Sequence, residues 1–215
     1  MYKINQTGRS MIEMLGVLAI IGVLSIGGIA GYSNAMKKYK INKAVEEITH
    51  LSQNIRRLYA NQKSYLGIEC NGNNEDEGCK IIKKANLAPE EMYQNQQNQN
   101  LIYDPWGNEV SIWVDDKYAS GSDNKAFIIY FDMYNKQDIC IELMSQDWSS
   151  LDGLVAVGGN PGDEVVQSYY GCEGSYDGGG NSPVACLGGR VLSVPMPISY
   201  AIKACENNDM ALKFY

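Results

Sequence analysis

The hydrophobic pattern of the chain begins with a long apolar run from Met11 to Tyr32, "MIEMLGVLAIIGVLSIGGIAGY", in which Glu13 is the only charged residue. As a helix that rises 1.5 Å per residue, this run extends about 30 Å, roughly the thickness of the hydrocarbon part of a bilayer. The run therefore predicts a membrane-spanning helix. The carboxylate near its start needs an explanation, because an unpaired buried carboxylate is costly.

Three interpretations of this segment differ in what they make of Glu13. A secretory signal peptide fits the short basic start with Lys3 and Arg9, but the apolar run is too long and contains an acid. An ordinary membrane anchor leaves Glu13 as an unexplained cost. A helix that assembles with other helices gives the carboxylate a positively charged partner.

Beyond Tyr32 the apolar residues become periodic. They recur at steps of three and four residues, at Ile41, Ala44, Val45, Ile48, Leu51, Ile55, Leu58 and Tyr59. This spacing places them in one stripe of an amphipathic helix. We therefore expect a single helix of about 50 residues, with residues 9–33 in the membrane or a filament core and 34–62 packed on a globular domain. His50 is expected at the solvated surface.

Residues 63–215 have the pattern of a globular domain built from shorter elements. Strands are predicted in "VSIWV" (110–114), "KAFIIYFD" (125–132) and "MALKFY" (210–215), and helices in "KQDICIELMSQDW" (136–148) and "PMPISYAIKAC" (195–205). The composition of "DPWGN" (104–108) indicates a turn. This order predicts an α+β fold in which an antiparallel sheet packs on the stripe of the long helix.

Three polar or glycine-rich stretches are predicted to be loops. They are "CNGNNEDEGC" (70–79), "EEMYQNQQNQN" (90–100) and residues 159–189, which include "SYDGGGN". The last is expected to be an exposed, variable loop, either suited to subunit contact or adhesion or a passive excursion of the surface.

The charge and the cysteines narrow the class of protein. A formal net charge of -7 excludes a generally basic surface, so a nucleic acid partner is not expected. All six cysteines follow the apolar run, and their even number predicts disulfides in an oxidising compartment. Cys70 and Cys79 end one polar loop and are expected to form a local disulfide. No C-x-x-C motif occurs and the acids of this loop miss the EF-hand spacing, so no metal or cofactor is expected.

No catalytic constellation is evident in the sequence. A single histidine, His50, limits pairs of nucleophile and base. The glycines of residues 178–180 lack the lysine and the strand–loop–helix setting of a phosphate-binding loop. We therefore expect that the chain is not an enzyme.

The residues from Gly8 to Glu13, "GRSMIE", followed by the apolar run, resemble the processing site of type IV prepilins. The resemblance implies that a prepilin peptidase removes residues 1–8 as a leader peptide and methylates the new N-terminus at Arg9. It also implies that Glu13, fifth in the mature chain, faces the α-amino group of a neighbouring subunit in a filament. Arg9 stands where the family usually has an apolar residue.

The helix also departs from the family in lacking its common mid-helix proline, since the first proline of the chain is Pro89. Glycines cluster there instead, at Gly27, Gly28 and Gly31. Glycine weakens a helix interior, so these residues could supply flexibility, and the spacing of Gly27 and Gly31 permits close helix contact. Ordinary membrane-helix glycines are the alternative.

Within this family, the strand with Ala-Phe and the following helix with Cys140 and a nearby Trp148 look most like the type IVb pilins, the toxin-coregulated and bundle-forming class. In that class the helix cysteine bonds to one near the C-terminus. Carried over, this pairs Cys140 with Cys205 and leaves Cys172 and Cys186 to pair with each other. The expected fold is then a long helix on an antiparallel sheet with a disulfide-tied C-terminal region.

The resemblance implies a structural pilus subunit whose partners are further copies of itself, the prepilin peptidase, an inner-membrane assembly platform, and a host or neighbouring-cell surface. Charges flanking the helix do not settle its orientation, and the cysteines favour a cytoplasmic N-terminus with a periplasmic globular domain at 63–215 before export into an extracellular pilus. The alternatives are a pseudopilin of a type II secretion system, a minor or tip pilin, and a membrane-anchored binding protein that is never processed.

Overall fold

The computed structural model describes residues 11–72, 75–93, 100–115, 124–134, 136–148, 150–158, 195–206 and 209–215. The chain divides into two compact units, residues 1–40 and 41–215. The described part of the first unit is entirely helical. The second contains the remainder of that helix and the sheet.

The helix α1 runs from Met11 to Tyr59 and is the longest element. Its first turn carries Glu13 and its last turn carries Arg56 and Arg57. An acid at the N-terminus and bases at the C-terminus both complement the helix dipole. The predicted long helix is thus present, and it ends at Tyr59, before the predicted residue 62.

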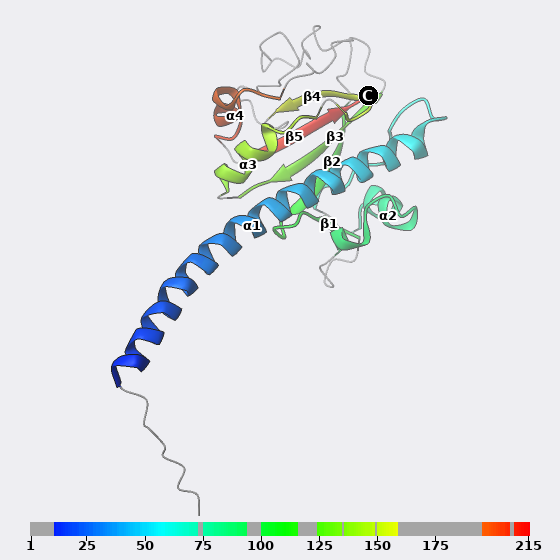
Figure 1. The fold of residues 1–215 in the computed structure, drawn as a ribbon. Coiled ribbons are helices and arrows are strands. Elements are labelled where there is room, and N and C mark those ends of the chain that lie inside the picture. The colour runs from blue at the N-terminus through cyan, green and yellow to red at the C-terminus, as the bar shows by residue number, and fades with distance from the viewer. Residues whose placement is uncertain are drawn as a thin grey trace, which may run out of the picture. The chain divides into compact units, whose positions relative to one another are not determined.

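The second unit is built on a five-stranded sheet in the order β1-β2-β3-β5-β4 (Figure 1). The strands are β1 (Ile102–Tyr103), β2 (Glu109–Asp115), β3 (Ala126–Asp132), β4 (Leu154–Gly158) and β5 (Asp209–Phe214). Every neighbouring pair is antiparallel, with Ile112 opposite Ile129 between β2 and β3 and Ile129 opposite Leu212 between β3 and β5. The predicted α+β class with an antiparallel sheet is confirmed.

Strands β3 and β5 lie in the middle of the sheet and have the most apolar faces. All six residues of β5 are buried, as are most of β3. Phe127 of β3 stacks on Phe214 of β5 with ring centroids 5.1 Å apart, and Tyr65 packs against Phe127 at 4.8 Å. These aromatic contacts link the two central strands to the loop that follows α1.

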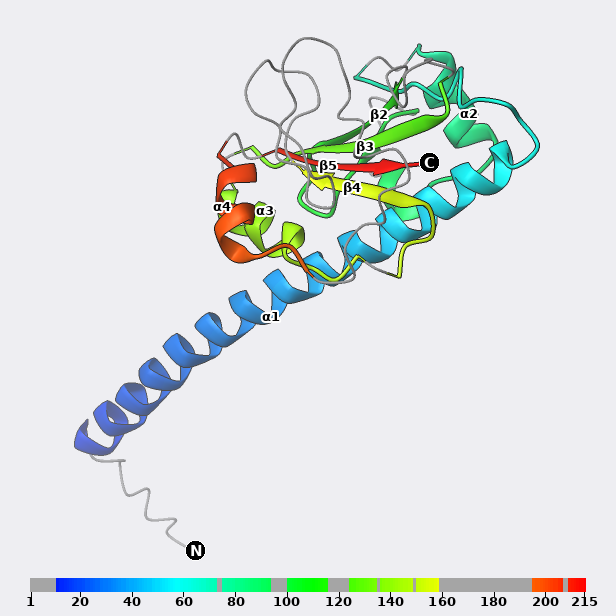
Figure 2. The same ribbon diagram turned by 90° about the horizontal axis from the view of Figure 1, so that it is seen from above.

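The part of α1 from Ile41 onward lies across one face of this sheet (Figures 1 and 2). Its buried apolar residues belong to the same core as the phenylalanines of β3 and β5, and they are Ile41, Ala44, Ile48, Leu51 and Ile55. This confirms most of the predicted stripe. Leu58 was placed on it wrongly, because the side chain is 44% exposed near the end of the helix.

Short helices flank the sheet. They are α2 (Glu77–Lys84), the 3-10 helix η1 (Glu90–Tyr93), α3 (Gln137–Met144) and α4 (Ile198–Ala204), and α3 and α4 lie side by side (Figures 1 and 2). Helix α3 ends earlier than predicted, and the Nε1–H of buried Trp148 caps it by donating to the carbonyl of Leu143 at 3.0 Å.

Two predicted loops contain structure. The stretch 70–79 leads into α2, where Cys79 and Ile82 are buried, and the stretch 90–100 begins with η1, where Met92 is buried. Strands β1 and β4 were also not predicted. The turn in residues 104–108 is confirmed: both carboxylate oxygens of Asp104 accept hydrogen bonds, from the backbone of Trp106 and from the backbone and side chain of Asn108.

Candidate assembly helix and its anchorage

The first part of α1 presents apolar side chains to its surroundings around its whole circumference. Within residues 11–31 of this helix, the large apolar residues exposed by more than half are Met11, Ile12, Met14, Leu15, Val17, Leu18, Ile20, Ile21, Val23, Leu24, Ile26 and Ile29. The most apolar 18-residue window has a mean hydropathy of 2.2, and none of it is buried. Among the described residues, α1 is the one helix that has the length and composition to cross a membrane. An apolar surface of this size requires lipid or other protein around it.

Glu13 lies in the first turn of α1 and is exposed, among those apolar side chains. Gly8 and Arg9, the predicted processing site, lie outside the described residues. Gly27 and Gly31 are in the helix, and a Cβ atom built on either would meet no other atom within 4 Å. Neither glycine is therefore required by a contact within the described chain, and close approach by another helix stays a prediction.

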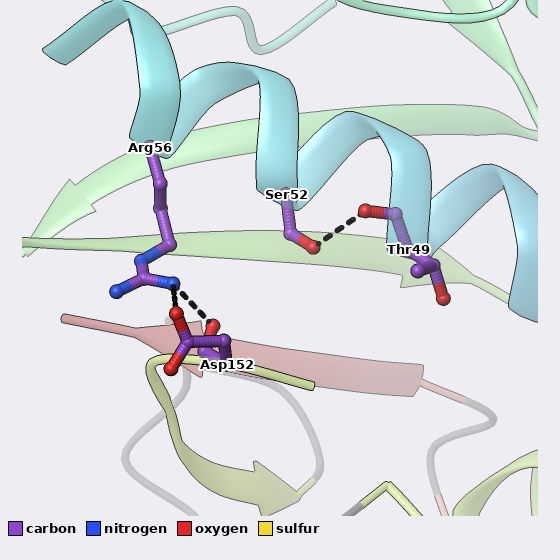
Figure 3. Close-up of polar contacts among 4 residues, drawn as sticks. All are labelled: Thr49, Ser52, Arg56 and Asp152. Atoms are coloured by element: carbon purple, nitrogen blue, oxygen red, sulfur yellow. Dashed lines mark hydrogen bonds and ion pairs between the residues drawn. The ribbon is translucent and has the colours of Figure 1, made fainter. Parts of the chain in front are cut away.

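The amphipathic part of α1 is fixed to the sheet unit by polar contacts as well as by its apolar stripe (Figure 3). Nη1 of Arg56 donates hydrogen bonds to the main-chain carbonyl of Asp152 at 2.7 Å and to its Oδ2 at 2.9 Å. The guanidinium group lowers the pKa of the Asp152 carboxyl. One turn earlier, the hydroxyl of buried Ser52 donates to the carbonyl of Thr49 at 3.1 Å, so this polar group is satisfied within the helix.

Gly153 completes this contact. Its φ is +78°, and a Cβ atom at this position would clash with the guanidinium group of Arg56. Glycine therefore serves twice here, because it adopts the left-handed conformation and leaves room for the arginine. The turn that precedes β4 therefore has the space for the side chain of Arg56 at the end of α1.

Two disulfides tie the sheet unit together. Cys70 is joined to Cys79, and Cys140 of α3 is joined to Cys205, which follows α4, across 65 residues of chain. Cys70 also exchanges two backbone hydrogen bonds with Ile112 of β2, so the first disulfide fastens α2 to the sheet. Cys172 and Cys186 lie outside the part of the chain that the structure describes, and their pairing stays a prediction.

A polar cleft of about 760 Å³ opens on the sheet unit beside α1, α2 and η1. It is lined in part by Lys43, Glu46 and Glu47 of α1 and by Glu90 and Glu91 of η1. Glu47 is 3% exposed. Burial raises the pKa of its carboxyl to about 7, opposed by Lys43 and assisted by Asp104, Glu91 and Glu46.

Comparison with known proteins assigns the family. The model of the bundlin family matches residues 33–210, most of the chain. The chain belongs to the bundlin family. This confirms the resemblance to pilins of the bundle-forming class. The matched region includes both described disulfides and strands β1 to β4, ends near the start of β5, and begins directly after the apolar run of residues 11–32.

Individual proteins are also similar to this chain, at low sequence identity. The major structural subunits of the bundle-forming pilus from Escherichia coli O127:H6 and from Escherichia coli O111:H- are each 26% identical over 130 residues. That match covers 60% of this chain and spans 58% of the length of those relatives. A type IVb pilin from Salmonella typhi aligns in three dimensions with a TM-score of 0.47 and 12% identity, over 81% of this chain and 98% of that one.

Sequence reasoning missed three residues that shape this bundlin-family unit: Glu47, Arg56 and Asp152. A signal existed for Glu47, because it lies three residues after Ala44 and four before Leu51 and so falls within the apolar stripe. His50, predicted at the surface, is exposed. Arg56 and Asp152 are 96 residues apart, and no local pattern predicts that contact.

Proposed function

We propose that this chain is a structural subunit of a type IVb pilus and polymerises through its N-terminal helix. The observation that carries the proposal is the combination of a wholly exposed apolar helix, from Met11 to about Ile29, with a disulfide-tied α+β unit of the bundlin family. Such a helix is stable in lipid before assembly and in a bundle of like helices afterwards. The related bundle-forming pilus subunits support the same role.

The proposed sequence of events starts in the inner membrane, with the N-terminus cytoplasmic and the unit from Ile41 onward periplasmic. A prepilin peptidase cuts after Gly8, and Arg9 becomes the methylated first residue. An assembly platform then moves the helix from lipid into the filament, where Glu13 pairs with the N-terminal amine of a neighbour. The surface loops meet host or neighbouring cells.

Glu13 provides the test, because its pairing is what distinguishes a pilus helix from a plain anchor. We expect Glu13→Gln to insert normally in the membrane but to be lost from sheared filaments. The matched control is Ser25→Ala, which changes another exposed polar residue of the same segment, one that bonds only within its own helix in the described chain. Filaments that contain Glu13→Gln at the level of the control would contradict the pairing role.

A further inference from the structure

The carboxylate of Glu47 is buried without the hydrogen bonds that a buried ion needs. Glu47 is 3% exposed, and neither Oε1 nor Oε2 has a hydrogen-bond partner among the described residues. Lys43 lies one turn earlier on α1, but its Nζ is 3.8 Å from Oε1, which is beyond hydrogen-bonding distance. A buried carboxylate in this state is costly, and its cost falls when a cationic donor reaches it.

Glu47 lines the polar cleft beside α2 and η1, which a side chain from outside the subunit can enter. Both carboxylate oxygens are covered in the single subunit, so the Glu47 side chain has to turn toward the cleft to meet a donor there. The cleft has four carboxylates, on Glu46, Glu47, Glu90 and Glu91, and three basic side chains, on Lys43, His50 and Lys83. This balance favours a cation. In addition, the negative charges of Asp104, Glu91 and Glu46 raise the pKa of the Glu47 carboxyl. The positive charge of Lys43 lowers it.

The size and chemistry of the cleft favour an organic cation over a metal ion. Its volume of about 760 Å³ is that of a site for a side chain or small molecule and far exceeds what one ion fills. Within the described ranges, no cluster of three or more histidine, cysteine, aspartate or glutamate side chains has the arrangement to hold a metal. A lysine ammonium or arginine guanidinium supplies the donors that Glu47 lacks.

We propose that this cleft receives a lysine or arginine side chain from a second copy of the chain, whose cationic group donates hydrogen bonds to the carboxylate of Glu47. The inference rests on the proposed function, because a pilus places many copies of the chain in fixed contact. It assigns to Glu47 a role in subunit contact separate from that of Glu13. The filament then completes a site that is incomplete in the single subunit.

The test compares incorporation of Glu47→Gln and wild-type chain when both are expressed together in cells that assemble filaments. The measured quantity is the ratio of variant to wild type in sheared filaments, divided by the same ratio in the membrane pool. Losing one partner of a buried charge pair is expensive, so we expect this quotient to fall at least about ten-fold. Glu69→Gln is the matched control, because Glu69 is an exposed glutamate outside the lining of the cleft, and its quotient should stay near unity.

A second measurement separates this role from a structural one. In the isolated full-length subunit in detergent at pH 8, Glu47→Gln should raise the unfolding midpoint, because it replaces a buried ion with a neutral group. A residue with only a structural role would change the stability of the subunit and its incorporation in the same direction. Incorporation of Glu47→Gln within two-fold of Glu69→Gln would overturn the inference while leaving the pilus function intact.

A free amine is the competing occupant of the cleft, and 1,5-diaminopentane serves as its probe. If the diamine raises the unfolding midpoint of the isolated wild-type subunit but not that of Glu47→Gln, and incorporation is unaffected, the cleft is a small-amine site and the second-copy inference is overturned. Absence of the wild-type chain itself from sheared filaments would overturn the proposed function and this inference together.

Discussion

Arg56 near the end of α1 donates hydrogen bonds to two oxygens of Asp152, the main-chain carbonyl at 2.7 Å and the carboxylate at 2.9 Å. The contact joins the last turns of the long helix to the turn that precedes β4. The arginine adds a polar contact to the apolar stripe, and Asn54 of the same helix adds another by donating its side-chain amide to the carbonyl of Leu87 at 2.8 Å.

Replacing Arg56 by alanine should weaken this junction. We expect Arg56→Ala to lower the free energy of unfolding by about 1 kcal/mol, because the hydrogen bond to a main-chain carbonyl is lost together with the ion pair. Asp152→Asn keeps that carbonyl and should cost less than Arg56→Ala. Urea unfolding of the two variants in the same detergent provides the comparison, and a larger loss in Asp152→Asn would contradict the importance of the carbonyl contact.

Gly153→Ala should destabilise the fold for two reasons. A left-handed φ costs a side-chain-bearing residue about 1–2 kcal/mol, and here the new methyl group also displaces the guanidinium of Arg56. Gly67→Ala is the matched control, since its φ is +92° but open space surrounds it. In an Arg56→Ala background the two glycine substitutions should have equal effects. A persistent difference there would show that the clash does not involve the arginine.

The two described disulfides should differ in their effect on stability. Removing the link between Cys140 and Cys205 opens a loop of 65 residues, which costs about 4 kcal/mol in the chain-entropy model. Removing the link between Cys70 and Cys79, with a separation of 9, should cost about 2.6 kcal/mol. Paired serine substitutions and urea unfolding check this order. Equal losses would mean that local contacts of α2, rather than loop length, set the effect of the shorter link.

The sequence predicted those parts of the fold whose patterns are long and regular. The apolar run and the stripe from Ile41 to Ile55 define α1, and the apolar stretches at 125–132 and 210–215 form the predicted strands β3 and β5. The pairing of Cys140 with Cys205 came from the family resemblance and not from any local pattern. These features repeat over many residues or are carried by a whole family, which is why they can be recognised in advance.

The missed elements are short and depend on tertiary contacts. Helix α2 has eight residues, too few to be stable alone, and is held by the disulfide of Cys79 and burial of Ile82. Strand β4 forms because it pairs with β5, which lies more than fifty residues later in the chain. The contact of Arg56 depends on Asp152, which is 96 residues away, so composition and periodicity do not reveal it. The burial of Glu47 follows from its place in the apolar stripe, but its lack of a hydrogen-bond partner among the described residues depends on the tertiary structure.

The buried carboxylate of Glu47 should make the stability of the isolated subunit depend on pH. Its pKa is raised to about 7 from 4.5, so the folded state holds a proton that the unfolded state releases. Protonation of Glu47 therefore stabilises the folded state. This stabilisation, about 3 kcal/mol, is fully present below pH 4.5 and is lost as the pH rises through about 7. Glu47→Gln removes this dependence.

The measurement is the difference in unfolding free energy between wild type and Glu47→Gln at several pH values from 4 to 8. Because other titrating groups, Asp104 among them, are present in both proteins, the difference isolates Glu47 to a first approximation. The unfolding free energy of Glu47→Gln should increase relative to that of wild type as the pH rises. A difference that stays constant across this range would show that Glu47 titrates alike in the folded and unfolded chains.

The central claim is that the chain is processed and built into a filament, and the most direct test is the intact mass and N-terminal peptide of material sheared from cells that contain a prepilin peptidase. We predict a chain that begins at Arg9, carries one added methyl group and has lost the six hydrogens expected for three disulfides. A chain that still begins at Met1 and stays in the membrane would contradict the pilus account, and Glu13 would then be an acid near the end of an ordinary anchor.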